Sequence, residues 1–556
     1  LKERGQPPVV YNRIRRKINY LLGLERQSRK DPKAFPRNPN DEDAAQAVTD
    51  SLRYVAESEQ FDDKRSEAWE DLLTPGSCAV MVGVKQDRYG LTPSIVHIPW
   101  DRFFWDPHSR RNDFSDARYM GIVTWYDMED AQERWPDAKD AITQTMENSH
   151  HTDTYDDRPK FKVWSDRKRA RVRVIEIYCQ KGGAWHRAVL TQAGFLEAYE
   201  PSPYLDEEGR PSNPIVAMSL YVDRDNNRYG DVRDLIDPQD EVNKRRSKGL
   251  HLISSRQVRV GPNSTMGPED IRKELARPDG VITSEDVEVL NTNDMAAQNL
   301  NLLQEAKAEI DLLGANAALT GKNENDMSGR AILAQQQGGM VEVALHFDRL
   351  RFLTLSVYRA IWARIRQTWD AGRWVRVTDD ERNLRFVGIN QPITAAQAMQ
   401  EELEGSPEMQ QRLQQDPMAQ QRLAAFMQSP QAQQVVEVRN VPAETDVDIM
   451  IDEGMDTPTI QAEQWGELVQ LASNGVIPIP PDLLIEASQL RDKDKLLERL
   501  KQPNPAQERQ QQLAEAGAVA EIEKAQSEAA ENMANAQSKM AGTQISAFEA
   551  GARAAG

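Results

Sequence analysis

The sequence predicts a helix-rich α+β protein, and three features indicate that class. Short β-branched runs alternate with turns from Cys78 to about residue 220. Two helical patterns then flank a small segment with strand character, and a single helical pattern continues from Ser328 to about Trp369. At 556 residues the chain is too long for one hydrophobic core, so we expect about two to four domains.

The N-terminal part of the chain is predicted to be mainly helical. A basic helix covers about 12–22, a stretch broken by prolines follows at 31–36, and further helices begin at Asp43 and near residue 61. The last of these ends before Pro75 at about residue 73. The helix from Asp43 carries an apolar stripe opposite its charged face, formed by Ala47, Leu52, Val55 and Ala56.

An α+β domain is predicted from about residue 78 to residue 220. The run 78–84 is short, apolar and β-branched, which is typical of a buried strand. One helix is expected near 127–146. The other strand-like pieces are 91–98, 171–179, 186–190 and 214–222.

Two further helices are predicted at about 238–255 and 295–318. Asp237 and Pro238 suit the start of the first, because Asp accepts hydrogen bonds from free backbone N–H groups and Pro fits the first helical position. The second has a coiled-coil-like seam of Leu303, Ala306, Ile310, Leu313 and Ala317. Between the two helices, strands are expected at 258–260 and 281–290, around a short helix at 268–276.

The longest predicted helix follows a polar loop at 321–327. It extends from Ser328 to about Trp369 and would span roughly 60 Å if straight. Gly338 and Gly339 predict a kink a few turns into it. Its buried stripe comprises Val343, Phe347, Leu350, Thr354, Val357, Ile361 and Ile365, extended by Trp362 and Trp369. A hairpin near 373–388 is expected to return to the α+β domain.

Residues 391–440 are rich in Gln, Met and Glu and are predicted to be a surface insertion. Short helices in series are expected there, because Ser or Asp followed by Pro recurs at Ser406, Asp416 and Ser429. A strand at 447–451 follows, and then helices at 458–474, 481–490 and 492–501. After Pro505 the chain is Ala-rich, and a helix of that composition buries too little apolar area to be held without neighbours.

No catalytic signature accompanies these elements. The glycines of 314–322 have the wrong spacing for a phosphate loop, and Asn323 stands where Ser or Thr must hold magnesium. Asp446, Asp448 and Asp452 could suggest a divalent ion, but their alternation with Val and Ile favours the solvated face of a half-buried strand. Neither a metal nor a cofactor is therefore predicted.

Charge and cysteine content narrow the function further. The net charge of −19 opposes ordinary nucleic-acid binding, since phosphate binding needs clustered Lys and Arg. It does not exclude a protein through which DNA slides, because an acidic or neutral bore repels a duplex weakly and lets it pass. The two cysteines, Cys78 and Cys179, fit buried thiols better than a disulfide.

The basic cluster at 244–248 has two interpretations. A solvated helix face is favoured, with partners such as Asp240 and Glu241 four residues earlier in the chain. Contact with DNA or with a packaging partner is the alternative.

Several motifs follow one another along the chain. They are Tyr11-Asn12-Arg13-Ile14, Asn38-Pro39, Pro99-Trp100-Asp101-Arg102-Phe103-Phe104-Trp105-Asp106-Pro107, Asp116-Ala117-Arg118-Tyr119, Tyr229-Gly230-Asp231, Asp240-Glu241-Val242-Asn243-Lys244 with Ser247, and Ser328-Gly329-Arg330-Ala331-Ile332. In this order they resemble the portal proteins of tailed phages, those of short-tailed phages most of all. The resemblance covers about 1–500.

The resemblance implies a series of regions along the chain. They are a wing (1–230), a first stem helix (231–255), a clip (256–294), a second stem helix (295–320), a tunnel loop with a long kinked helix and a wing return hairpin (321–390), a helical crown with the Gln-rich insertion (391–504), and a C-terminal barrel helix or disordered tail (505–556).

The resemblance also implies a non-enzymatic ring of twelve subunits at one capsid vertex of the virion, assembled in the host cytoplasm. Double-stranded DNA would pass through it during packaging and ejection. Terminase and then tail adaptor proteins would dock on it, beside major capsid and scaffolding proteins. Twelve helices about 10 Å apart would lie on a circle about 38 Å across and leave a bore of about 28 Å, which admits a duplex.

Candidate functional residues follow from these assignments. Those for the DNA channel are Lys244, Arg245, Arg246, Lys248, Lys322, Asn323, Asn325 and Arg330. Those for a partner on the clip are Arg256, Arg259, Glu269, Asp270, Arg272 and Lys273, and the helix kink is assigned to Gly338 and Gly339. A capsid scaffolding or tail-adaptor protein is the main alternative, and a nuclease or packaging ATPase comes third.

Overall fold

The computed structural model describes residues 8–29, 31–37, 42–88, 90–148, 163–254, 257–277, 279–290, 293–313, 329–378, 384–405, 417–451 and 470. The chain divides into two units, Leu1–Met455 and Asp456–Gly556, and every described residue except Gln470 belongs to the first. Outside the described residues lie the predicted polar loop at 321–327, the helices expected at 458–474, 481–490 and 492–501, and the Ala-rich segment after Pro505.

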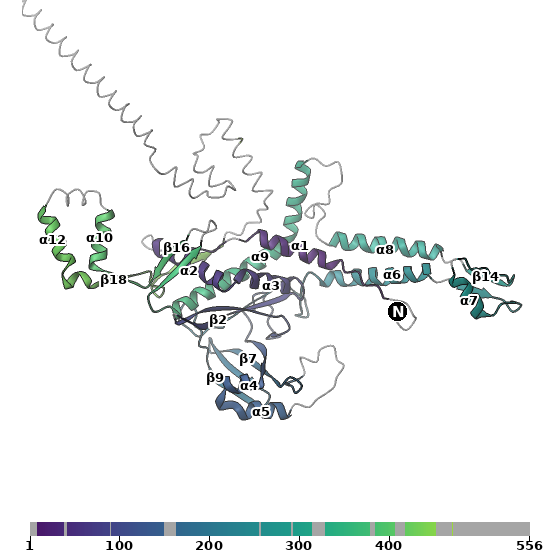
Figure 1. Cartoon of the computed structure of the whole chain (residues 1–556), viewed down its shortest axis with the longest axis horizontal. Coiled ribbons are helices and arrows are strands. Elements are labelled where there is room, and N and C mark those ends of the chain that lie inside the picture. The colour runs from purple at the N-terminus through teal and green to yellow at the C-terminus, as the bar shows by residue number, and fades with distance from the viewer. Residues whose placement is uncertain are drawn as a thin grey trace, which may run out of the picture. The chain divides into compact units, whose positions relative to one another are not determined.

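The fold is helix-rich α+β, as predicted, and its largest core forms where N-terminal helices meet one long helix (Figure 1). These helices are α1 (Ile14–Gln27), α2 (Glu42–Ser58), α3 (Phe61–Leu73) and α9 (Gly329–Thr368). The apolar stripe predicted for α9 is buried from Val343 onward. Phe347 of this stripe lies against Trp69 of α3, with ring centroids 5.5 Å apart.

Two antiparallel sheets extend this core. The first has the order β10 (Ile215–Ser219), β2 (Ser77–Asp87), β3 (Gly90–Ile98), and both α3 and α9 contact it. The second has the order β4 (Phe103–Trp105), β5 (Tyr119–Asp127), β7 (Arg171–Lys181), β8 (Ala184–Thr191), β9 (Gly194–Pro201), with β6 (Ser165–Asp166) on β7.

The single helix expected near 127–146 is wrong, because two helices lie there. They are α4 (Met128–Arg134) and α5 (Lys139–Asn148), with a 3₁₀ turn at Pro136–Ala138 between them. Pro136 has no N–H to continue the first helix, and it disfavours a helical backbone at Trp135, whose ψ is 72°.

The stretch expected to be broken by prolines contains a strand. It is β1 (Lys33–Pro36), which pairs antiparallel with β19 (Val447–Met450). The predicted half-buried strand at 447–451 is confirmed, since Val447, Ile449 and Ile451 are buried. This pairing joins parts of the chain about 400 residues apart in sequence.

Two helices, α6 (Ile236–Ser254) and α8 (Asn293–Leu313), run side by side (Figure 1). Between them in sequence lie β13 (Gln257–Val260), α7 (Pro268–Ala276) and β14 (Val287–Leu290), and the two strands pair antiparallel. Since α6 leads into β13 and β14 leads into α8, this small unit lies at the end of the helix pair.

Two boundaries predicted in this region are wrong. The first helix begins at Ile236, directly after a 3₁₀ turn at Arg233–Leu235, so Asp237 does not cap it. The strand expected at 281–290 begins only at Val287. Residues before it bond to the loop at 261–265 through side chains instead, as Asp286 accepts from the N–H of Asn263 at 2.9 Å.

The helix α9 continues through both Gly338 and Gly339. Figure 1 draws it as two stretches that meet at a steep angle, which agrees with a bent helix. That Gly338 and Gly339 cause the bend stays a prediction. After α9, the predicted hairpin forms from β15 (Arg373–Thr378) and β16 (Leu384–Ile389), and β15 packs on α2.

The Gln-rich segment begins and ends in paired strands, β17 (Gln391–Thr394) and β18 (Val435–Arg439). Between them lie α10 (Ala395–Gly405), α12 (Pro417–Met427) and a 3₁₀ helix at Pro430–Gln433. Two of these start at a proline, as the repeated motif predicts. The repeat at Ser406 lies outside the described residues.

Candidate functional site

The helix pair α6 and α8 has a small hydrophobic core within the described side chains. Its hydrophobic core consists of Val242, Leu303, Ala306 and Ile310. Three leucines of the same two helices stay exposed, at 47% for Leu250, 53% for Leu300 and 42% for Leu302. Exposed leucines on a thin helical hairpin make this hairpin a candidate surface for contact with another chain.

The basic cluster on α6 has the partners that its spacing predicts. Lys244 Nζ lies 3.7 Å from Asp240 Oδ2, and Arg245 pairs with Glu241. Lys248 is exposed and has no ion pair among the described residues. The interpretation as a solvated face therefore accounts for Lys244 and Arg245.

Arg246 of the same cluster faces the N-terminal segment of the chain. Its guanidinium lies 5.3 Å from the centre of the Tyr11 ring, which is a cation–π distance. Residues 9–13, which we call the arm, run along α6 and meet three polar side chains that we call the ladder. The ladder consists of Gln239, Asn243 and Ser247.

Gln239 makes two hydrogen bonds to the arm backbone. Its Oε1 accepts from the N–H of Arg13 at 2.8 Å, and its Nε2 donates to the carbonyl of Tyr11 at 2.6 Å. Asn243 Oδ1 accepts from the N–H of Tyr11 at 2.9 Å. Ser247 Oγ accepts from the N–H of the arm's first residue, also at 2.9 Å.

The spacing of helix and arm explains why the ladder fits. Its members are four residues apart on α6, which is a rise of about 6 Å per step. The arm residues they bind are two apart, which is about 6.6 Å in an extended chain. The ladder thus binds peptide backbone rather than particular side chains, and it fixes α1 to α6.

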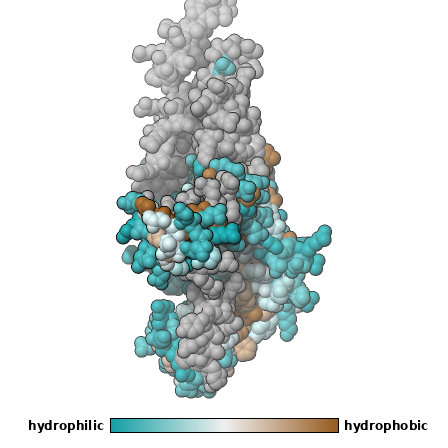
Figure 2. All heavy atoms as spheres, turned by 90° about the vertical axis from the view of Figure 1, so that its right-hand side faces the viewer, coloured by the Kyte–Doolittle hydropathy of each residue, from teal (hydrophilic) through white to brown (hydrophobic). Residues whose placement is uncertain are grey.

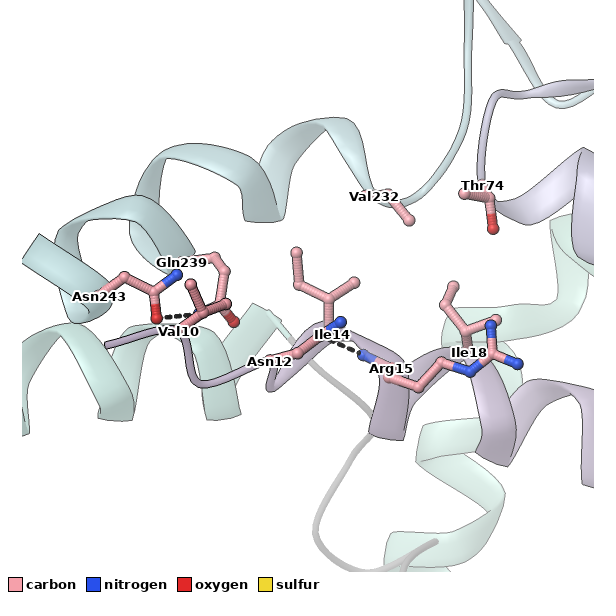
Figure 3. A pocket seen from close by; sticks show the side chains of 9 residues that line it. All are labelled: Val10, Asn12, Ile14, Arg15, Ile18, Thr74, Val232, Gln239 and Asn243. Atoms are coloured by element: carbon pink, nitrogen blue, oxygen red, sulfur yellow. Dashed lines mark hydrogen bonds between the residues drawn. The ribbon is translucent and has the colours of Figure 1, made fainter. Parts of the chain in front are cut away.

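A cavity of about 290 Å³ lies where the arm, α1 and the start of α6 meet (Figure 3). Its apolar wall is formed by Val10, Ile14, Ile18 and Val232. Gln239 and Asn243 lie at one end, and Arg15 lies farther along α1. Arg15 pairs with Glu70 of α3 at 2.5 Å.

The unit between α6 and α8 carries the predicted partner-binding residues. Arg259 on β13 is exposed, and so are four residues of α7, namely Glu269, Asp270, Arg272 and Lys273. The face that includes this unit is mainly hydrophilic, with scattered apolar groups (Figure 2). Arg256 lies outside the described residues.

Of the predicted channel residues that do not belong to α6, one lies in the described part of the chain. Arg330 is the second residue of α9. Lys322, Asn323 and Asn325 lie outside the described residues. That the channel candidates of α6 and of the loop line one channel therefore stays a prediction.

The acidic residues near β19 bind an arginine instead of forming a metal site. The guanidinium of Arg37 lies 2.8 Å from Asp446 Oδ1 and 2.7 Å from Asp448 Oδ1. Asp452 lies outside the described residues, within which no group of three metal-binding side chains occurs. Cys78 and Cys179 are both free, but Cys179 is only partly buried.

Sequence reasoning missed the ladder. Its only signal was an amide, an amide and a hydroxyl at positions i, i+4 and i+8 of one helix. That spacing shows a shared face but not what lies on it. No helix in the described part of the chain is both long and apolar enough to cross a membrane.

Two comparisons relate this chain to known proteins. A family model for phage P22-like portal proteins matches residues 1–552. The portal protein of Helicobacter pylori bacteriophage KHP30 is 19% identical over 397 residues, which cover 70% of this chain and 63% of that protein. The chain therefore spans less than two thirds of the length of this relative.

Proposed function

Because the chain belongs to the phage P22-like portal protein family, we propose that it forms a ring at one capsid vertex and is the conduit for DNA packaging and ejection. The alternative of a scaffolding or tail-adaptor protein has no support from the family match. The family is structural, so we propose no enzymatic activity.

The small core of the helix pair carries the proposal of a ring. Leu250, Leu300 and Leu302 are exposed on a hairpin whose hydrophobic core, within the described side chains, comprises four residues. A neighbouring copy would cover them and would present the same surface to the next copy. Repeated head-to-tail contacts of this kind close a ring when the rotation between copies fits. The family implies twelve copies.

The described elements fit the regions of such a subunit. α6 and α8 would be the stem, and β13, α7 and β14 the clip. The α+β sheets with α1 to α3 would be the wing, and α9 the tunnel helix. The strand-bounded segment at 391–439 would belong to the crown.

The charge of the chain suits passage of DNA rather than tight binding. With a net charge of −19, the subunit as a whole repels phosphate. Two of the basic residues on α6 are neutralised by neighbouring carboxylates. Of the remaining two, Arg246 lies over the ring of Tyr11, and Lys248 is exposed with no ion pair among the described residues.

The partners proposed for the ring are those that the family implies for the clip and the wing. Its exposed charges would meet terminase during packaging and the tail adaptor afterwards. Major capsid and scaffolding proteins would surround the wing. The finished ring would reside in the virion, after assembly in the host cytoplasm.

Mass measurement of the purified chain tests the ring. Twelve chains of 63.0 kDa weigh about 756 kDa, and mass photometry should show particles near that value. Chains that stay monomeric at every concentration would contradict the proposal.

Deletion of 256–294 tests the clip separately. The stem helices and the wing remain, so rings of the shortened chain should still form. Binding of terminase, measured by co-sedimentation with the rings, should be lost. Terminase binding equal to that of the full chain would remove the clip assignment.

A further inference from the structure

Three charged or polar side chains from distant parts of the chain meet close to the start of α6. They are Lys17 of α1, Asp231 in the turn before α6, and His346 of α9, and we call them the junction triad. Lys17 Nζ lies 2.8 Å from Asp231 Oδ2, and His346 Nε2 lies 3.0 Å from Asp231 Oδ1. Their side chains are 15%, 11% and 7% exposed, so water screens these contacts little.

The backbone around Asp231 is held independently of the triad. Its N–H donates to the carbonyl of Leu73 at 2.9 Å. A side chain on Gly230 would come within 2.3 Å of that same carbonyl oxygen, so only glycine permits this approach. Gly76, with φ of +91°, likewise leaves no room for a side chain beside Tyr229. The carboxylate therefore has a fixed position to which the other two side chains attach.

The surroundings of His346 favour one orientation of its ring. Tyr221 meets the ring edge-on, with centroids 6.1 Å apart, and Tyr221 itself stacks on Tyr229. The second ring nitrogen, Nδ1, is buried and makes no hydrogen bond within the described residues. The position of His346 thus depends on its bond to Asp231 and on packing against Tyr221.

His346 lies where α9 becomes part of the core. Val343 and Phe347 beside it are buried, and the buried stripe continues from there to the end of the helix. Two residues before Val343, the side chain of Val341 is 75% exposed. The glycine pair predicted to kink the helix lies a further two residues back. The triad therefore lies at the start of the buried stripe of α9 that begins at Val343.

We propose that Lys17, Asp231 and His346 are positioning residues, which fix the turn of α9 from which its N-terminal part leaves the wing. This proposal rests on the proposed function, in which α9 is the tunnel helix and its N-terminal part lies toward the channel. Because Asp231 lies shortly before α6, with the 3₁₀ turn at Arg233–Leu235 between them, one carboxylate sets the direction of both the tunnel helix and the stem. Without the triad, the first turn of α9 that is held in place would lie closer to the C-terminus of the helix.

Hydrogen exchange of the assembled full-length protein tests this proposal. In His346→Leu and Asp231→Asn, amides of 340–350 should exchange at least about tenfold faster, because a buried charge loses its partner. Exchange in 353–365 should not change. His346→Gln keeps a donor of similar reach and should stay within about twofold of the natural protein.

The matched control is Asp348→Asn, an exposed acidic residue two positions further along α9. It should leave exchange in both segments unchanged. Equal exchange in 340–350 for His346→Leu and for the control would overturn the proposal. So would faster exchange spread evenly over the wing, which marks a general loss of stability. If His346→Leu does not fold, hydrogen exchange in 340–350 of the isosteric variant Asp231→Asn tests the same contact.

Ring mass measured on the same samples separates this inference from the proposed function. If the natural protein forms no ring, the proposed function fails while the exchange pattern still reports on the triad within one subunit. If rings form and exchange in 340–350 does not respond, only the role of the triad fails.

Discussion

At the scale of single residues, buried charged side chains connect segments that lie far apart in the sequence. Asp231 is the clearest case. Burial alone would raise its pKa, but the hydrogen bond from His346 and the charge of Lys17 outweigh burial and lower the pKa to about 2. The ordinary value is 3.8, so the folded state holds the ionised form more tightly than the unfolded chain does.

The lowered pKa of Asp231 makes the folded state less stable in acid. The stabilisation is fully present above pH 4 and is lost as the pH falls from about 4 to about 2, because the unfolded chain takes up the proton first. The shift corresponds to about 2 kcal/mol. The difference in unfolding free energy between the natural protein and Asp231→Asn should shrink by that amount between pH 5 and pH 2 in urea titrations. A constant difference would contradict the coupling.

Arg364 joins α9 to distant parts of the chain in a similar way. It is 2% exposed, and burial lowers its pKa to about 10. Its guanidinium donates to the carbonyls of Val82 at 3.3 Å and Leu205 at 2.9 Å, and to Ser212 Oγ at 3.2 Å.

Arg364→Met should therefore lower the free energy of unfolding by about 3 kcal/mol, since it leaves buried carbonyl groups without donors. Arg359→Met, at an exposed position of the same helix, is the control and should change it by less than about 0.5 kcal/mol. Chemical denaturation measures both. Equal effects of the two substitutions would show that the buried contacts contribute nothing specific.

At the scale of elements, the pairing of arm and helix depends on matched spacing. Gln239 and Asn243 make three hydrogen bonds to the arm backbone. Each such bond contributes about 1 kcal/mol.

The double variant Gln239→Ala, Asn243→Ala should release the arm. Amides of Tyr11 and Arg13 should then exchange at least about tenfold faster, as read by hydrogen exchange. Lys244→Ala, an exposed substitution on the same helix, should have no such effect. Unchanged protection of the arm in the double variant would mean that packing, not the ladder, holds it.

The exposed leucines of the stem give a prediction about assembly. Leu300→Ser should leave the folding of the subunit almost unchanged, because the side chain is 53% exposed there. It should weaken ring formation, because the leucine would be covered only by a neighbour. Gln304→Ser, an exposed substitution one turn further along α8, is the control. Sedimentation would reveal the outcome, and rings of equal stability in both variants would exclude this surface from the contact.

Most elements could be predicted because their patterns are local. The stripe of α9 from Val343 to Ile365 and the short helix at Pro268–Ala276 follow from periodicity and a proline start. The pairing of β1 with β19 could not be predicted, since nothing near Lys33 indicates a partner at Met450. The ladder and the junction triad were missed for the same reason. The ladder lies more than 200 residues from the arm that it binds, and the triad members are more than 100 residues apart. Each of these residues alone looks like an ordinary surface residue.

At the scale of the whole molecule, the central claim is that the subunit is completed by its neighbours. The helices α1 to α3, proposed as part of the wing, share an extensive core with α9 that includes Trp69, Leu350 and Ile361. The hydrophobic core of α6 and α8, the proposed stem, comprises only four of the described residues. A large core in one part of the subunit and a small one in its helix pair fit a subunit whose helix pair is covered by neighbouring copies.

Electron microscopy of the purified, full-length chain, viewed along the symmetry axis of its particles, tests this claim most directly. We predict closed rings of about twelve copies with an open axial channel near 28 Å across, wide enough for a DNA duplex. Separate globular particles, or closed assemblies with no passage along the axis, would contradict it.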